Sequence, residues 1–131
     1  MAKQQTDKKA ARTVTAQDRL NNAAAQVKRL LGVEQQSLAD AIAAQKWTHL
    51  AHIDAQIQGL SAALRHLHVE RVSTKSDIEK LSETFRAYAQ EAEQKRDGCV
   101  TDEDYTHVAS YEGMSCAWLK VSLAVLESID A

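Results

Sequence analysis

The absence of proline constrains the fold of this chain more than any other feature of its sequence. None of the 131 residues is proline and only four are glycine, so the closely spaced turns of β-rich folds lack their usual residues. Alanine, leucine, glutamine, glutamate and lysine are abundant, and these residues lose little conformational freedom in a helix. We therefore predict an all-α fold in which antiparallel helical hairpins form a small bundle of about four helices.

Length and charge distribution indicate one helical domain with a basic N-terminal tail. A chain of 131 residues has the usual size of a single domain. Residues 1–14 carry four basic side chains against one acidic side chain, and short polar termini of this kind are typically disordered. We expect a disordered basic tail over residues 1–14 and a single helical domain over residues 15–131.

The overall charge and composition exclude several classes of function. The net charge of -2 disfavours nucleic-acid binding, because phosphate backbones attract proteins with an excess of positive charge. The basic tail leaves open an arm that holds DNA with an affinity that falls steeply with salt. Two cysteines are too few for a disulfide scaffold. Because we also find no apolar run of the ~18 residues that span a bilayer and no signal peptide, we expect a cytoplasmic protein without a membrane span.

Four segments carry apolar residues at helical spacing. We predict helices near residues 16–44, 47–70, 76–97 and 102–129. Thr15 is expected to cap the first helix, with Asp18 near the positive end of its dipole. Ser76 and Glu79 have the spacing of a capping box for the third helix.

The connections between the predicted helices are marked unequally. Gly98 is the expected left-handed C-cap of the third helix, and Thr101 is the expected start of the fourth. Residues 44–46 contain no strong helix breaker, so they form either a turn or the middle of one long helix. We favour the turn, because a single amphipathic rod would need a dimer to bury its apolar stripe.

The last predicted helix has a wider apolar surface than packing against one neighbour requires, which is somewhat over ~100°. Large apolar side chains occupy much of its C-terminal half, namely Trp118, Leu119, Val121, Leu123, Val125 and Leu126. This width has two interpretations. The helix either lies buried at the centre of the bundle or covers a groove that a client helix can take over.

No group of residues in the sequence predicts catalysis. His49 and His52 lie one turn apart, but metal sites in bundles take ligands from several helices, typically with Glu-x-x-His pairs, and no such pair is present. Cys99 and Cys116 do not form a Cys-x-x-Cys motif, and we expect Cys116 to lie in the core. We therefore predict a non-enzymatic protein with no catalytic residues, no metal site and no cofactor.

One part of the chain resembles a known family. Leucines at helical spacing between Val27 and Leu67, the polar stretch at residues 43–46, and the pair Trp47 and Leu50 resemble flagellar export chaperones of the FliT type. The related FlgN type shares this leucine- and glutamine-rich style. The resemblance covers about a third of the chain and ends at Ser73. It implies a cytoplasmic adaptor that holds an aggregation-prone flagellar subunit and delivers it to the export ATPase complex.

These patterns together predict a protein that binds a helical client or an export component through an amphipathic groove. The expected contact residues lie on the last three predicted helices: Trp47, Leu50, Ile57, Phe85, Tyr88, Trp118, Leu119 and Leu123. The alternative is a homodimeric structural or regulatory helical protein, of phage or plasmid origin, whose remaining apolar stripe is covered by its own twin.

Overall fold

The structure, a computed structural model that describes residues 13–130, consists of four α-helices and one short 3-10 helix. The elements are α2 (Ala16–Ala43), η1 (Trp47–His49), α3 (Leu50–Val69), α4 (Lys75–Thr101) and α5 (Tyr105–Glu127). The described residues contain no strand, so the prediction of a small all-α bundle is confirmed. The predicted disordered tail at residues 1–14 lies outside the described residues except for its last two positions.

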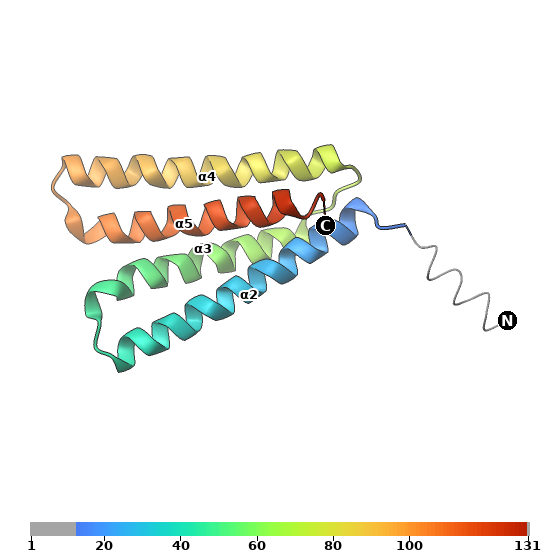
Figure 1. Cartoon of the computed structure of the whole chain (residues 1–131). Helices are drawn as coiled ribbons and strands as arrows, with labels where there is room; N and C mark the ends of the chain where they lie inside the picture. The colour runs from blue at the N-terminus through green and yellow to red at the C-terminus, as the bar shows by residue number, and fades with distance from the viewer. Residues whose placement is uncertain (1–12, 131) are drawn as a thin grey trace.

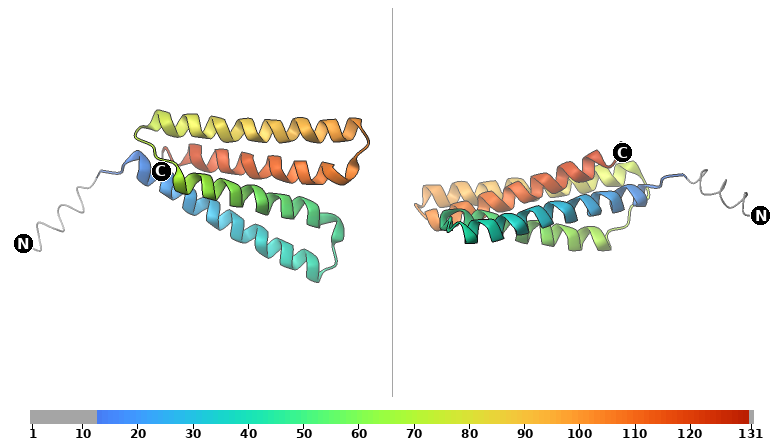
Figure 2. Two further views of the ribbon diagram at one scale, coloured as in Figure 1. Left: turned by 180° about the vertical axis from the view of Figure 1, so that it is seen from behind. Right: turned by 60° about the horizontal axis from the view of Figure 1, so that its bottom comes forward.

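Two antiparallel hairpins make up the bundle, α2 with α3 and α4 with α5 (Figure 1). Helix α5 lies between α4 and the α2–α3 hairpin, and the view from behind in Figure 2 shows the same order. Helix α5 packs against all three other helices. Helix α3 runs parallel to it, in the same direction. None of the helices in residues 13–130 is both long and apolar enough to cross a bilayer.

Capping boxes start α2 and α4. Thr15 Oγ1 accepts from the Asp18 N–H at 3.0 Å, which confirms the predicted cap, and Asp18 in turn accepts from the Thr15 N–H. The predicted capping pair of α4 is wrong, because Thr74 rather than Ser76 has the extended backbone of an N-cap. Asp77 reaches back to accept from the backbone N–H groups of Ser73 and Thr74.

Left-handed residues other than glycine close both hairpins. The turn predicted at residues 44–46 is confirmed, with Gln45 at φ 57° and the Lys46 N–H bonded to Ala41 O at 2.8 Å. This bond belongs to a Schellman motif, which satisfies the last carbonyl groups of α2.

The same motif ends α4, but later than predicted. Helix α4 continues through Gly98 to Thr101, so Gly98 is not a C-cap and Thr101 does not start α5. Glu103 takes the left-handed position at φ 59°, and the Asp104 N–H bonds Cys99 O at 2.8 Å. The left-handed residue thus lies five positions beyond the predicted glycine.

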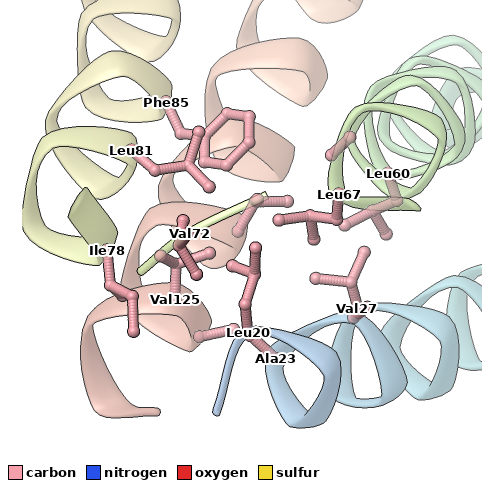
Figure 3. Packing of buried hydrophobic residues seen from close by; sticks show 14 of the residues in the cluster. Leu20, Ala23, Val27, Leu60, Leu67, Val72, Ile78, Leu81, Phe85 and Val125 are labelled. Carbon is pink, nitrogen blue, oxygen red and sulfur yellow. The ribbon is translucent and has the colours of Figure 1, made fainter. Parts of the chain in front are cut away.

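The core gathers side chains from all four helices (Figure 3). Its largest fully buried members are Phe85, Leu20, Leu60, Leu67, Ile78, Val27, Val121 and Val125. Buried hydroxyl groups also join α4 to α5, since Ser82 Oγ donates to Ser122 O at 3.0 Å and Ser122 Oγ donates to Ser82 O at 2.9 Å. Burial therefore leaves neither hydroxyl without a partner.

Two glycines allow α3 and α5 to approach each other closely. A Cβ atom added at Gly113 would lie 2.3 Å from the carbonyl oxygen of His52, and one added at Gly59 would lie 2.7 Å from Ala117 Cβ. Ala55 and Ala63 are also buried. The contact is thus made between small residues, and a larger side chain at either glycine would push the two backbones apart.

The orientation of α5 follows from this contact. Ala117, Val121 and Val125 turn inward and pack in the core, so α5 takes the central position of one of the two interpretations, although its surplus apolar width is not buried. Leu119 and Leu123 instead lie on the solvent side, with 43% and 55% of their surface exposed. These two predicted contact residues remain exposed because the close approach to α3 turns the small side chains of α5 inward.

The close contact predicts opposite effects for the same substitution at two glycines. Gly113→Ala should lower the free energy of unfolding by about 1–3 kcal/mol, because the new methyl group must displace the backbone of α3. Gly32 has open space around it in α2, so Gly32→Ala should raise stability by about 0.5–1 kcal/mol. Urea denaturation measures both. Equal stabilities for the two variants would show that α3 and α5 do not touch at Gly113.

The capping box of α4 predicts an acid-dependent loss of stability. The two backbone N–H groups that donate to Asp77 hold its pKa below the ordinary value of 3.8. A lowered folded-state pKa adds stability above the unfolded pKa, and this contribution is lost as the pH falls through the folded pKa. Asp77→Asn should therefore be less stable than the wild type at neutral pH, and the difference should shrink in acid.

Urea denaturation from about pH 7 down to about pH 2 tests this linkage. Glu79→Gln provides the matched control, because Glu79 lies exposed two residues after Asp77 in α4 without a capping bond to Ser73 or Thr74. A stability difference for Asp77→Asn that stays constant down to the lowest pH would contradict the assignment.

Candidate partner-binding groove

Aromatic rings from three helices cluster on the side of α5 that faces α4. The rings of Phe85 and Trp118 stack with centroids 5.6 Å apart and planes 14° apart. Tyr88 meets Trp118 edge to face at 5.1 Å, and His66 of α3 meets Phe85 in the same way at 5.2 Å. Both arrangements are favourable aromatic geometries and fix the ring of Trp118 in place.

A pocket of about 350 Å³ opens beside this cluster. Its walls come from two antiparallel helices, with Tyr88, Glu91, Ala92 and Lys95 on α4 and Tyr111, Met114 and Trp118 on α5. We call this pocket the aromatic groove. Its size suits a few apolar side chains rather than a large cofactor.

Charge is confined to one edge of the aromatic groove. Lys95 Nζ lies 3.5 Å from Glu91 Oε1, and both side chains are more than half exposed. Such exposed pairs contribute little to stability, so either group is available to a ligand at low cost. The groove thus combines apolar and aromatic walls with a polar rim, as protein-binding sites commonly do.

The structure brings only part of the predicted contact set together here. Tyr88 and Trp118 line the groove. Phe85 is fully buried beneath Trp118, so the prediction that it contacts a partner is corrected to a supporting role. The physical reason is that its ring fills the core between α3, α4 and α5, as its contacts with His66 and Trp118 show.

The remaining predicted contacts lie in two other places. Trp47 stands in η1 at the hairpin turn with 59% of its surface exposed, and Leu50 and Ile57 are half-buried on α3. Leu119 and Leu123 lie on the outer side of α5, away from the groove lining. The eight residues therefore do not form one continuous surface.

Sequence reasoning missed Tyr111 and Met114. Both precede Trp118 on α5 at spacings of seven and four, which place all three on one face of the helix. Met114 reaches α3 as well, since its sulfur would lie 3.1 Å from a Cβ atom at Gly59. A search for apolar residues in register with Trp118 would have identified them.

A chain of polar side chains joins α2, α3 and α5 elsewhere in the bundle. Lys120 Nζ donates to Gln56 Oε1 at 2.7 Å and lies 3.4 Å from Glu34 Oε1. Gln56 Nε2 lies 3.2 Å from His52 Nδ1, and His52 Nε2 lies 3.9 Å from the sulfur of Cys116. Gln56 is buried, so these partners satisfy an amide that water does not reach.

The directions of these bonds decide what His52 and Cys116 can do. Lys120 donates to the oxygen of the Gln56 amide, so the amide nitrogen faces His52 Nδ1. His52 Nδ1 must therefore accept a hydrogen bond from the amide N–H. A neutral His52 ring then carries its proton on Nε2 and donates toward sulfur. A general base would need to accept the thiol proton at that nitrogen, so this arrangement does not activate Cys116 as a nucleophile.

The remaining candidates for chemistry are paired locally or kept protonated. Burial, together with the charges of Asp104 and Asp102, raises the pKa of the Cys99 thiol. Hydrogen bonds from Thr106 and His107 lower the pKa of Asp104, whose carboxylate lies 2.7 Å from His107 Nδ1. Residues 13–130 contain no group of three histidine, cysteine, aspartate or glutamate side chains placed to hold a metal ion.

A comparison of the chain with protein families, characterised proteins and solved structures finds no significant match. The resemblance to flagellar export chaperones therefore stays a prediction.

Proposed function

We propose that this chain is a non-enzymatic binding protein that holds a helical segment of a partner protein in the aromatic groove. The observation that carries the proposal is the open, largely apolar pocket formed by Tyr88, Met114 and Trp118. Trp118 and Tyr88 are held by aromatic contacts. Rigid aromatic side chains in a preformed pocket are typical anchor sites of protein interfaces.

The shape of the groove favours a helix as the ligand. Helices α4 and α5 run side by side along the full length of their hairpin (Figure 1), and an amphipathic helix can lie along such a pair with its apolar residues at spacings of three and four. Glu91 and Lys95 at the rim would contact its polar residues. An extended peptide would find no strand edge among the described residues to pair with.

The finer proposal is an export chaperone that holds a flagellar subunit in the cytoplasm. It rests on the resemblance of the segment from Val27 to Leu67. Two features are compatible with it. Trp47 is exposed at the hairpin turn, where it could contact an export component, and the aromatic groove on the other hairpin could hold the client at the same time.

The competing proposal from the sequence is a homodimeric structural or regulatory protein. The observation that favours it is the row of exposed leucines on α5. This row is separate from the residues of the aromatic groove, so a partner and a second copy of the chain would not compete for one surface.

Binding through the aromatic groove predicts that one tyrosine matters and another does not. Tyr88→Ala should weaken the binding of an amphipathic helical peptide about 10–30-fold, because it removes an anchor from the pocket wall. Tyr105 is more exposed and lies outside the groove, so Tyr105→Ala should leave the affinity unchanged. The probes are peptides from the terminal helices of flagellar filament-cap and hook-associated subunits, together with unrelated amphipathic helices.

Trp118 emission in a Trp47→Phe background reports occupation of the groove. Equal losses for Tyr88→Ala and Tyr105→Ala, or no binding of any helical peptide, would contradict the binding proposal. Binding of unrelated helices without preference for the flagellar peptides would contradict the export proposal alone.

A further inference from the structure

Three leucines form an exposed row along α5. Leu119, Leu123 and Leu126 have 43%, 55% and 41% of their surface exposed, and their spacings of four and three place them on one side of the helix. We call this row the leucine face. Contiguous exposed leucines on a folded domain mark an interaction surface more often than scattered single ones do.

Two opposite charges flank the leucine face on the side of α2. Lys120 is held on this side by Gln56 and by Glu34 of α2. Glu127 lies seven residues after Lys120 on α5 and also borders α2, beside Gln26 and Arg29. Glu127 has no ion pair within residues 13–130. Lys120 has three N–H donors and the two partners named above, which leaves one donor for a further acceptor.

We propose, as a step that rests on the homodimer alternative above, that the leucine face binds a second copy of this chain, with the two α5 helices antiparallel about a two-fold axis at Leu123. With a rise of about 1.5 Å per residue, Leu119 lies about 6 Å before the axis and Leu126 about 4.5 Å after it. Leu119 of one copy therefore lies level with Leu126 of the other to within about 1.5 Å. The leucines are self-complementary, as a two-fold interface requires.

The flanking charges select the antiparallel arrangement. The same arithmetic sets Lys120 level with Glu127 of the other copy to within about 1.5 Å, and the axis brings the α2 sides of the two copies together. Each copy would thus supply one cation and one anion to two equivalent ion pairs. A parallel arrangement would set Lys120 level with Lys120 and Glu127 level with Glu127, so the charges would not complement each other.

The small size of the leucine face sets the strength of the dimer. Three partly exposed leucines and two charge pairs make an interface at the lower end of the range for specific association, so the dissociation constant should be on the order of 100 µM. Sedimentation equilibrium of the wild type should show a dimer that grows with concentration. A wild-type chain that stays monomeric to about 1 mM would overturn the proposal.

Substitution at the axis gives the first test. Leu123→Arg places two cations face to face on the axis and should abolish the dimer while leaving the helical circular dichroism unchanged. Val69→Arg is the matched control, because Val69 is 75% exposed at the end of α3, and it should dimerise like the wild type. Dimerisation of Leu123→Arg at wild-type strength would overturn the proposal.

Cysteine cross-linking tests the antiparallel geometry. In a Cys99→Ser, Cys116→Ser background, Leu123→Cys should form a disulfide-linked dimer under copper-phenanthroline oxidation, because the two copies of residue 123 meet at the axis. Leu119→Cys alone should not, since its copies lie about 12 Å apart along the helices, beyond disulfide reach. A mixture of Leu119→Cys and Leu126→Cys should cross-link. Self-linkage at position 119 as strong as that at position 123 would overturn the antiparallel axis.

Discussion

The close approach of α3 and α5 is the contact on which the rest of the bundle depends. Gly113 lies against the carbonyl group of His52, and Gly59 lies against Ala117. This spacing turns the small side of α5 toward α3 and leaves Val121 and Val125 to fill the core with residues from the other helices. Once that side is buried, the positions of Trp118 and of the three leucines follow from the helical period.

The function proposed here uses the two remaining sides of α5. Toward α4, Trp118 stacks on buried Phe85 and forms the wall of the aromatic groove with Tyr88 and Met114. Away from the core, Leu119 and its neighbours remain exposed. Binding of a partner helix and pairing with a second copy would therefore take place on different faces of one central helix, without displacing it.

Capping residues and helical spacing in the sequence predicted those parts of the fold that depend on residues close together in the chain. The four helices, the Thr15 cap and the turn at residues 44–46 agree with the structure. The predicted end of α4 was wrong because Glu103, rather than a glycine, takes the left-handed conformation. The sequence did not show which apolar side of α5 is buried, because the choice depends on the contact of Gly113 in α5 with α3 and of Gly59 in α3 with α5. The polar chain from Lys120 to Cys116 could not be predicted, because it passes through side chains of α2 and α3 that are far from α5 in the sequence.

Native-state hydrogen exchange of the α5 amides tests the central position of this helix most directly. If α5 is held by α2, α3 and α4 together, amides from Gly113 to Val125 should exchange only through global unfolding, with the same free energy that urea denaturation gives. Gly113→Ala should lower both values equally. Exchange of these amides through a separate opening, at a free energy below that of buried amides in α3 and α4, would show that α5 is a detachable cover and contradict the account.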